Sequence, residues 1–163
     1  MRVCLIIPPS PFLLDERVFV QLGILKIASV LEQHNYTVDM IDLSGVENYT
    51  DVLTDYVKRK ERADIFGVTA TTPQVPYAVK ISQHLKALLP GKQSKVILGG
   101  PHVTLMHTAA KREAKKNLVG SDRATKDIEA LKNFFDVLVC GDGEIAIFDA
   151  IHEDIKVIDA DIA

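Results

Sequence analysis

The chain has 163 residues, of which 47% are hydrophobic and 25% are charged, and its formal net charge is −3. A chain of this length can bury about 70% of the surface that it exposes when unfolded, so we expect a core that needs neither a disulfide nor a metal. The small acidic excess argues against nucleic acid as a direct ligand, because binding to phosphate backbones depends on clustered cations.

The two cysteines, Cys4 and Cys140, both lie within apolar runs. This placement favours buried thiols in a reducing compartment over a disulfide or a metal site, and we therefore expect a cytoplasmic protein. The opening apolar run stops at Pro8 and Pro9, which makes it too short for the core of a signal peptide. No stretch approaches the ~20 apolar residues of a membrane helix, so we predict no membrane association.

Short runs rich in Val, Ile, Leu and Phe recur along the chain between turn residues, which is typical of strands. They span residues 2–7, 37–43, 64–70, 95–100 and 136–141. Their nearly continuous apolarity predicts a parallel sheet covered on both faces. Helical patterns alternate with them, at residues 22–34, 50–62, 77–91 and 144–155. The alternation predicts a flavodoxin-like or Rossmann-like three-layer α/β/α sandwich, with a five-stranded parallel sheet in the order 2-1-3-4-5.

Residues 103–135 separate the fourth run from the fifth, a longer interval than one crossover helix needs. Within it, GSDRATKD at residues 120–127 predicts a turn between two helices. We therefore predict a single domain over residues 1–163 with a helical insertion at about 103–135. The cluster KREAKK at residues 111–116 is interpreted as a solvated helix face, with a partner-docking surface as the alternative.

In open α/β sheets the ligand crevice lies beyond the carboxyl ends of the strands, so the residues after each strand are candidates for a binding site. These loops read PPSP at residues 8–11, TATTPQ at 69–74, GGPH at 99–102 and GDGE at 141–144. Three of them are small, hydroxylated or glycine-rich with almost no charge, which lets a large ligand approach the backbone. Each glycine is also common in ordinary turns, and it is their coincidence at one edge that favours a site.

Other modules of this topology fit the loops less well. A phosphoacceptor receiver needs acids after the first strand, an aspartate ending the third and a lysine after the fifth, but the sequence has IIPPS, GVTAT and VCGDG there. A flavin mononucleotide module needs a Ser/Thr-rich phosphate loop and stacking aromatics, whereas the first loop is PPSPF and the chain has no Trp.

A nucleotide-binding Rossmann-like module is a further alternative. Gly141, Gly143 and Ala146 have the G-x-G-x-x-A spacing of dinucleotide-binding units, and KVIDAD supplies acids about 20 residues later. Such a unit builds on the first strand of its sheet and needs further strands after it, which we do not expect before Ala163.

Taken together, the loops resemble the cobalamin (vitamin B12)-binding N-terminal domain of radical S-adenosylmethionine enzymes, over nearly the whole chain. The resemblance is carried by Pro8-Pro9, Leu22-Gly23, Asp42, the D-I-x-G-x-(S/T) pattern at 64–69, GGPH with Thr104, and GDGE, which matches the family's G-E-G-E. It implies that the corrin ring lies across the carboxyl edge of the sheet and that the nucleotide tail runs down beside the strands.

The resemblance also implies which residues bind the cofactor. A side chain at Gly99 or Gly100 would occupy the space of the tail, threonine hydroxyls would contact the tail or the corrin amides, and the first loop would line the lower face of the ring. Asp142 and Glu144 are alternatively caps of the loop and of the last helix. The candidate set is Pro8, Pro9, Ser10, Pro11, Thr69, Thr71, Thr72, Gly99, Gly100, Pro101, His102, Thr104, Gly141, Asp142, Gly143 and Glu144.

The loop after the first strand lacks the histidine that ligates cobalt in some cobalamin carriers. Carriers similar to methionine synthase place D-x-H-x-x-G after the first strand, and its histidine replaces the tail base on cobalt. Here that loop reads PPSPFLLDERVFVQLG, so no histidine from it can ligate cobalt. His102 is interpreted as a loop residue near the ligand, and no metal ligand or catalytic residue is assigned. The other histidines, His34, His84, His107 and His152, are interpreted as solvated.

Two isolated cysteines cannot supply the C-x-x-x-C-x-x-C thiolates that hold a four-iron four-sulfur cluster. We therefore expect S-adenosylmethionine and the cluster only in a downstream barrel domain. The resemblance implies that the chain is the cobalamin-binding domain of a methyltransferase-like radical enzyme. A stand-alone, non-catalytic interaction or scaffold domain of the same fold is the alternative.

Overall fold

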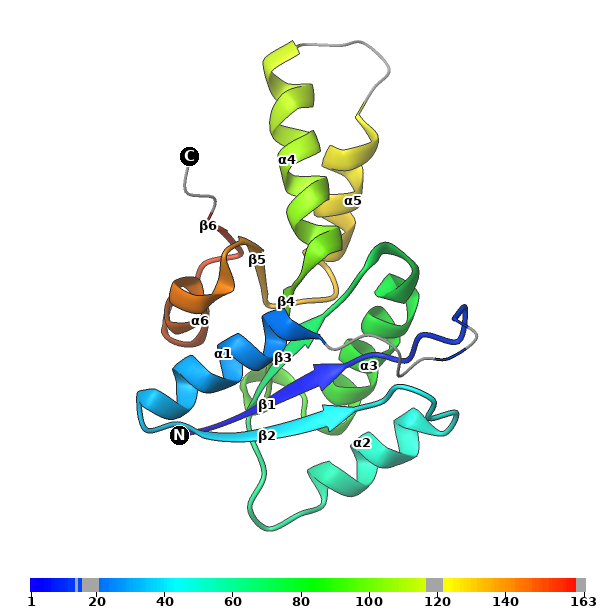
Figure 1. The fold of residues 1–163 in the computed structure, drawn as a ribbon, viewed down its shortest axis with the longest axis vertical. Helices are drawn as coiled ribbons and strands as arrows, with labels where there is room; N and C mark the ends of the chain where they lie inside the picture. The colour runs from blue at the N-terminus through cyan, green and yellow to red at the C-terminus, as the bar shows by residue number, and fades with distance from the viewer. Residues whose placement is uncertain (14, 16–20, 117–121, 161–163) are drawn as a thin grey trace.

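Strands and helices alternate along the computed structural model, which describes residues 1–13, 15, 21–116 and 122–160 (Figure 1). The strands are β1 (Arg2–Ile7), β2 (Thr37–Asp42), β3 (Ile65–Thr69), β4 (Lys95–Gly99), β5 (Val137–Gly141) and β6 (Val157–Ala160). The helices are α1 (Leu22–Gln33), α2 (Tyr49–Val57), α3 (Val75–Leu88), α4 (Pro101–Lys116), α5 (Arg123–Leu131) and α6 (Gly143–His152). Short 3-10 turns η1 (Thr72–Gln74) and η2 (Gly91–Gln93) precede α3 and β4.

The strands form one parallel sheet in the order β2-β1-β3-β4-β5-β6. The predicted parallel sheet and the order of its first five strands are confirmed, but the predicted number of strands is wrong. The sixth strand pairs with β5, with Leu138 opposite Val157 and Gly141 opposite Ala160. Its sequence VIDA is only four residues long and includes Asp159, so it lacks the long apolar run that identified the buried strands.

Two cores cover the two faces of the sheet, because side chains alternate between the faces along each strand. Cys4 and Ile6 of β1 pack in the core that α2 and α3 complete with the inner ends of α4 and α5. Val3 and Leu5 point to the other face, which α1 and α6 cover. Burial on both faces explains why β1, β3, β4 and β5 are almost continuously apolar.

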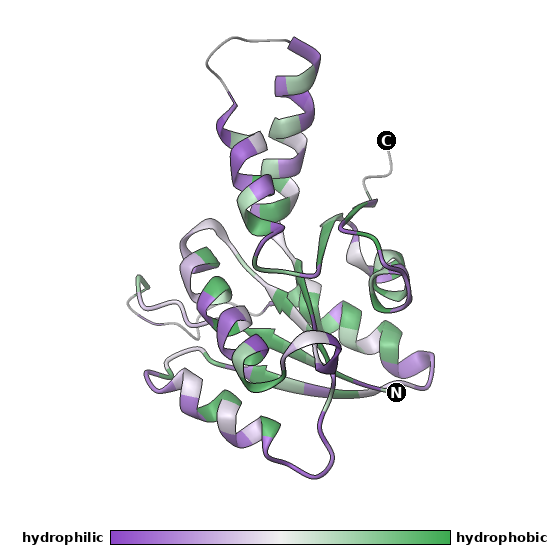
Figure 2. Ribbon diagram, turned by 180° about the vertical axis from the view of Figure 1, so that it is seen from behind, coloured by the Kyte–Doolittle hydropathy of each residue, from purple (hydrophilic) through white to green (hydrophobic). Residues whose placement is uncertain are grey.

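The predicted insertion is a helical hairpin of α4 and α5 that projects beyond the sheet (Figure 1). Its hydrophobic residues gather at the base, and its outer turns are mostly hydrophilic (Figure 2). In the KREAKK cluster, Glu113 caps α5, because its carboxylate accepts the N–H groups of Ala124 and Thr125, each at 3.0 Å. The hydrogen bond from the Thr125 hydroxyl lowers the pKa of Glu113. The first residues of the predicted turn, 120 and 121, lie outside the described residues, and residues 123–127 lie in α5, so the turn predicted at 120–127 was placed too far along the chain.

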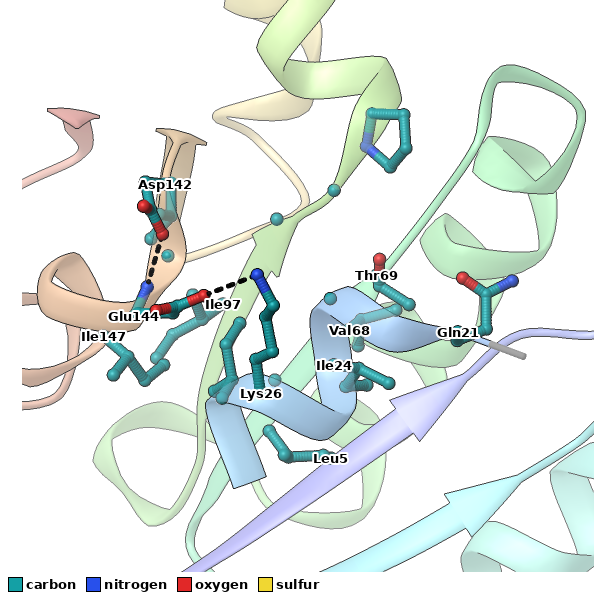
Figure 3. A pocket seen from close by; sticks show the side chains of 18 of the residues that line it. Leu5, Gln21, Ile24, Lys26, Val68, Thr69, Ile97, Asp142, Glu144 and Ile147 are labelled. Carbon is teal, nitrogen blue, oxygen red and sulfur yellow. Dashed lines mark hydrogen bonds and ion pairs between the residues drawn. The ribbon is translucent and has the colours of Figure 1, made fainter. Parts of the chain in front are cut away.

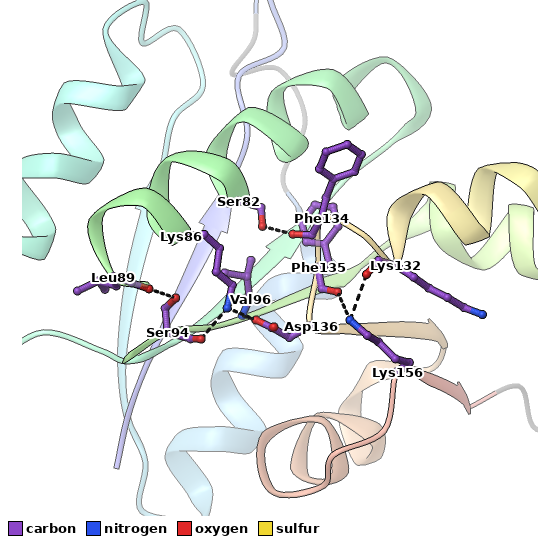
Figure 4. A network of polar contacts seen from close by, with 10 residues as sticks. All are labelled: Ser82, Lys86, Leu89, Ser94, Val96, Lys132, Phe134, Phe135, Asp136 and Lys156. Atoms are coloured by element: carbon purple, nitrogen blue, oxygen red, sulfur yellow. Dashed lines mark hydrogen bonds and ion pairs between the residues drawn. The ribbon is translucent and has the colours of Figure 1, made fainter. Parts of the chain in front are cut away.

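Polar contacts tie the strands together at the amino end of the sheet (Figure 4). Asp136, just before β5, accepts the Val96 N–H at 2.7 Å and pairs with Lys86 of α3. The ammonium of Lys86 also donates to the Ser94 carbonyl at 2.7 Å. This end of the sheet is therefore closed by the protein's own polar groups, and the carboxyl end is the one left for a ligand.

Both cysteines are buried, as predicted, and burial raises the pKa of each thiol from 9.0 to about 12. We expect neither thiol of the folded protein to react with a disulfide reagent at about pH 8, and both to react in denaturant. The free energy of unfolding should fall as the pH rises from about 9 to about 12, because only the unfolded thiols ionise there. A native thiol that reacts within minutes would contradict this burial.

Candidate functional site

A cleft of about 370 Å³ opens at the carboxyl edge of the sheet, between α1, α6 and the strands (Figure 3). Its walls are mostly apolar, which suits a large ligand fixed by a few polar groups. The lining residues are Leu5, Gln21, Gly23, Ile24, Lys26, Ile27, Gly67, Val68, Thr69, Ile97, Gly99, Gly100, Pro101, Val139, Gly141, Asp142, Gly143, Glu144 and Ile147.

Two glycines on neighbouring strands make the floor of this cleft. Gly67 of β3 lies in register between Leu5 of β1 and Ile97 of β4, and Thr69 pairs with Gly99 further towards the carboxyl ends. By the alternation along the strands, Gly67 and Gly99 face the same side as Ile97, towards α1 and α6. The sheet therefore lacks side chains at two positions beneath these helices.

Gly67 and Gly99 differ in whether the packing of the protein itself requires glycine. A Cβ at Gly67 would lie 2.8 Å from the Leu5 side chain, so packing within the protein already favours glycine there. A Cβ at Gly99 would meet only the Val139 carbonyl oxygen, at 3.8 Å, which is an ordinary contact. Nothing in the described packing requires glycine at Gly99, and the open floor there is available to a ligand.

Gly100 has a structural role instead. Its φ is +101°, a region that residues with a side chain rarely adopt. A Cβ there would lie 2.9 Å from the backbone nitrogen of Ala70 and 2.5 Å from the Thr69 hydroxyl oxygen. The turn from β4 into α4 therefore needs Gly100 for its own conformation, although the residue also borders the cleft.

Charged groups stand at the mouth of the cleft. Asp142 is the N-cap of α6 and its carboxylate accepts the Glu144 N–H at 3.2 Å, which confirms the predicted capping role. Glu144 pairs across the opening with Lys26 of α1, at 3.3 Å (Figure 3).

Residues 8–11, at the start of the first loop, do not line the cleft. Pro8, Pro9 and Ser10 are buried, and the Gln74 amide donates to the Pro8 carbonyl at 3.1 Å and to the Ser10 hydroxyl at 2.8 Å. Gln74 also accepts the backbone N–H of Thr71 at 3.0 Å. This glutamine, which the sequence analysis did not single out, fixes two of the predicted loops to each other.

His102 is not in a loop, contrary to the sequence interpretation. It lies in the first turn of α4 and is 6% exposed. Its Nδ1 lies 2.9 Å from the Thr72 hydroxyl and its Nε2 lies 2.8 Å from the Asp127 carboxylate of α5. Both ring nitrogens are thus engaged within the protein, and the side chain ties the helical hairpin to η1.

The structure brings about half of the predicted site residues to the cleft. Those that line it are Thr69, Gly99, Gly100, Pro101, Gly141, Asp142, Gly143 and Glu144. Pro8 to Pro11, Thr71, Thr72, His102 and Thr104 do not line it. The Thr104 hydroxyl accepts the Gly141 N–H at 3.0 Å and donates to the Gly100 carbonyl at 2.9 Å, so it joins two loops at the rim.

The α1 wall of the cleft was missed, apart from the Leu22-Gly23 pair in the resemblance. In the sequence, Ile24 and Ile27 have the spacing of core residues in an amphipathic helix, and Lys26 does not differ from other surface lysines. Their sequence therefore gives no sign of a binding site. Only the juxtaposition of α1 with α6 shows that they border the same space as Gly99.

The structure supports one requirement of the dinucleotide-binding alternative, a further strand, but not the other, an available carboxylate at the end of that strand. The expectation that no strand follows the glycine-rich turn is wrong, because β6 lies parallel to β5. The Asp159 carboxylate of β6, however, contacts Lys111 at 2.8 Å and His107 at 3.1 Å. The acid that this alternative needs on β6 is therefore engaged by cations of the protein itself.

Within the described part of the chain, no three His, Cys, Asp or Glu side chains are grouped to hold a metal ion. The helices described there are also too short or too polar to cross a bilayer.

An open parallel sheet with an apolar, glycine-floored cleft at its carboxyl edge defines an α/β ligand-binding domain. Residues 16–120 match the B12 binding domain family, and the chain belongs to that family. Membership supports cobalamin as the ligand.

Comparison with solved structures finds a cobalamin-binding protein from Desulfitobacterium hafniense DCB-2 among the similar chains. The TM-score is 0.46 at 19% sequence identity, over 61% of this chain and 44% of that chain. The chain thus covers less than half of that protein's length. No curated protein matches the sequence.

Proposed function

We propose that this domain binds cobalamin with its nucleotide tail in the cleft between α1, α6 and the sheet, and with the corrin ring across the carboxyl edge. The observation that carries the proposal is Gly99. Its open face leaves room beneath the helices that the protein's own packing does not explain. Ile24, Ile97 and Ile147 offer apolar walls to a flat aromatic base.

Exposed apolar side chains at the rim support the position of the ring. Leu22, Leu105 and Ile145 lie within the first five residues of α1, α4 and α6, and 60% or more of each is exposed. All three helices begin at the carboxyl edge of the sheet. Large apolar residues exposed along one edge of a sheet are typical of a surface that a ligand or partner covers.

We further propose that no histidine of this domain ligates cobalt. The first loop has none, and His102 already uses both ring nitrogens on Thr72 and Asp127. Bound cobalamin would supply methyl-transfer or radical chemistry at cobalt, while this chain binds and orients it. Electron paramagnetic resonance of protein loaded with cob(II)alamin should show cobalt hyperfine lines without nitrogen splitting. Nitrogen splitting that disappears in His102→Gln would identify a histidine ligand and overturn this proposal.

The parent enzyme that we propose is a radical S-adenosylmethionine enzyme of the methyltransferase type. Support comes from the ordered motifs at Pro8-Pro9, GGPH and GDGE. The chemistry would take place in a separate barrel, because Cys4 and Cys140 are buried on two strands and cannot hold an iron–sulfur cluster together. A gene that encodes a cysteine triad downstream of this domain would support this context, and a stop codon there would favour a stand-alone binding protein.

The direct test is retention of colour. Protein incubated with hydroxocobalamin at micromolar concentration should elute from gel filtration with the corrinoid absorbance at the protein peak. If all of the colour elutes in the small-molecule fraction while the protein remains folded, cobalamin is not its ligand.

A further inference from the structure

Lys26 is the one cation among the described residues that line the cleft. It lies one turn into α1, and its ammonium reaches across the opening to Glu144 in the first turn of α6, at 3.3 Å (Figure 3). The other acid of the lining, Asp142, is occupied as the cap of α6. The Lys26 ammonium therefore stands at the mouth of the cleft with a single carboxylate partner among the contacts described.

This ion pair contributes little to the stability of the fold. The Lys26 side chain is 68% exposed and that of Glu144 is 37% exposed, and pairs of this kind are weakened by solvent. The ammonium can therefore exchange its partner at low cost. The first turns of α1 and α6 both border this opening, through Gly23 and Gly143, and their backbone dipoles add partial positive charge there.

The chemistry of the ligand supplies an anion for this position. In cobalamin a phosphodiester joins the corrin side chain to the ribose of the tail. When the base enters the cleft and the ring stays outside, the phosphodiester must pass the mouth. We propose that Lys26 binds this phosphodiester, and that Glu144 holds the ammonium in place until the ligand arrives. This inference rests on the proposed function, because it names Lys26 as the residue that contacts the phosphodiester of the proposed ligand.

Three corrinoids separate the contributions of ring, phosphate and base. Cobinamide has the ring without the nucleotide, cobinamide phosphate adds the phosphate, and cobalamin has the complete tail. Dissociation constants would be measured by visible absorbance titration for the wild type, Lys26→Gln and Glu144→Gln. Lys80→Gln is the matched control, because Lys80 is an exposed lysine on α3, on the opposite face of the sheet.

We expect Lys26→Gln to weaken cobalamin and cobinamide phosphate about three- to tenfold and to leave cobinamide within about twofold. Glu144→Gln should strengthen binding of the two phosphate-bearing corrinoids, because it frees the ammonium and removes a repelling charge. The salt dependence of cobalamin affinity should be steeper for the wild type than for Lys26→Gln. Lys80→Gln should match the wild type throughout.

Several results would overturn the assignment. If Lys26→Gln changes the affinities for all three corrinoids equally, the substitution acts through the fold and not through a phosphate contact. No change in any of the three affinities would also exclude a phosphate contact. Equal losses in Lys26→Gln and Glu144→Gln would mean that the ion pair matters only by holding α1 to α6. Wild-type protein that binds cobinamide as tightly as cobalamin would place the tail outside the cleft. A wild type that binds no corrinoid would instead refute the proposed function itself.

Discussion

Gly99→Leu should abolish retention of cobalamin while the protein stays folded. The new side chain would project from β4 into the floor of the cleft, and its first carbon would meet only the Val139 carbonyl oxygen at 3.8 Å. The tail base would lose its place against the sheet. Burial of an aromatic group contributes about 2–3 kcal/mol, so we expect the dissociation constant for cobalamin to rise by about 30- to 100-fold or more.

The control for Gly99→Leu is Thr37→Leu, which adds a similar side chain at an exposed position on the edge strand β2. Both variants would be compared with the wild type by absorbance titration and by thermal unfolding. Thr37→Leu should bind cobalamin normally. If Gly99→Leu unfolds at the wild-type temperature and still binds cobalamin with unchanged affinity, the tail does not occupy this cleft.

Gly100→Ala should destabilise the fold by about 2–4 kcal/mol, an effect of a different kind. The φ of +101° disfavours any side chain, and the added methyl would press on the backbone of Ala70, whose nitrogen would lie 2.9 Å away. Because Ala70 donates to the Gly99 carbonyl at 3.2 Å and accepts from the His102 N–H at 3.1 Å, a displacement there would disturb the junction of β3, β4 and α4. Urea denaturation of the apoprotein measures the loss.

Gly99→Ala is the control variant for the urea denaturation of Gly100→Ala. Its φ is not in the left-handed region and its Cβ has room, so its free energy of unfolding should lie within about 1 kcal/mol of the wild type. Equal stability of Gly100→Ala and Gly99→Ala would show that the turn after β4 tolerates a side chain at both positions. The two variants also explain why a bulky residue at Gly100, which the sequence alone would suggest, is a poor probe of the cleft.

The sequence predicted the central fold because apolar strands buried on both faces leave a strong pattern. The runs at residues 2–7, 95–100 and 136–141 became β1, β4 and β5 with boundaries shifted by a residue at most. It failed where the pattern is weak. VIDA is only four residues long and partly exposed, which is too short a pattern to identify a strand. The predicted helix over residues 50–62 was too long at its end, because α2 stops at Val57 and the polar run KRKER at residues 58–62 does not continue it.

The site was predicted less completely, for a physical reason. Position after a strand identifies which loops share an edge, and this placed Thr69, Gly99 and Gly141 correctly at the cleft. It does not tell which way a side chain points. His102 and Thr104 follow β4 in the chain, yet their side chains are engaged by Thr72, Asp127, Gly100 and Gly141 within the protein.

A crystal structure of the protein with bound cobalamin would test the proposed binding mode most directly. We expect the tail base between α1 and the sheet, against Gly99 and Ile97, with the corrin ring across the first turns of α1, α4 and α6. A complex in which the base stays on cobalt, and in which Ile24, Ile97 and Ile147 line the cleft without contacting the cofactor, would contradict it.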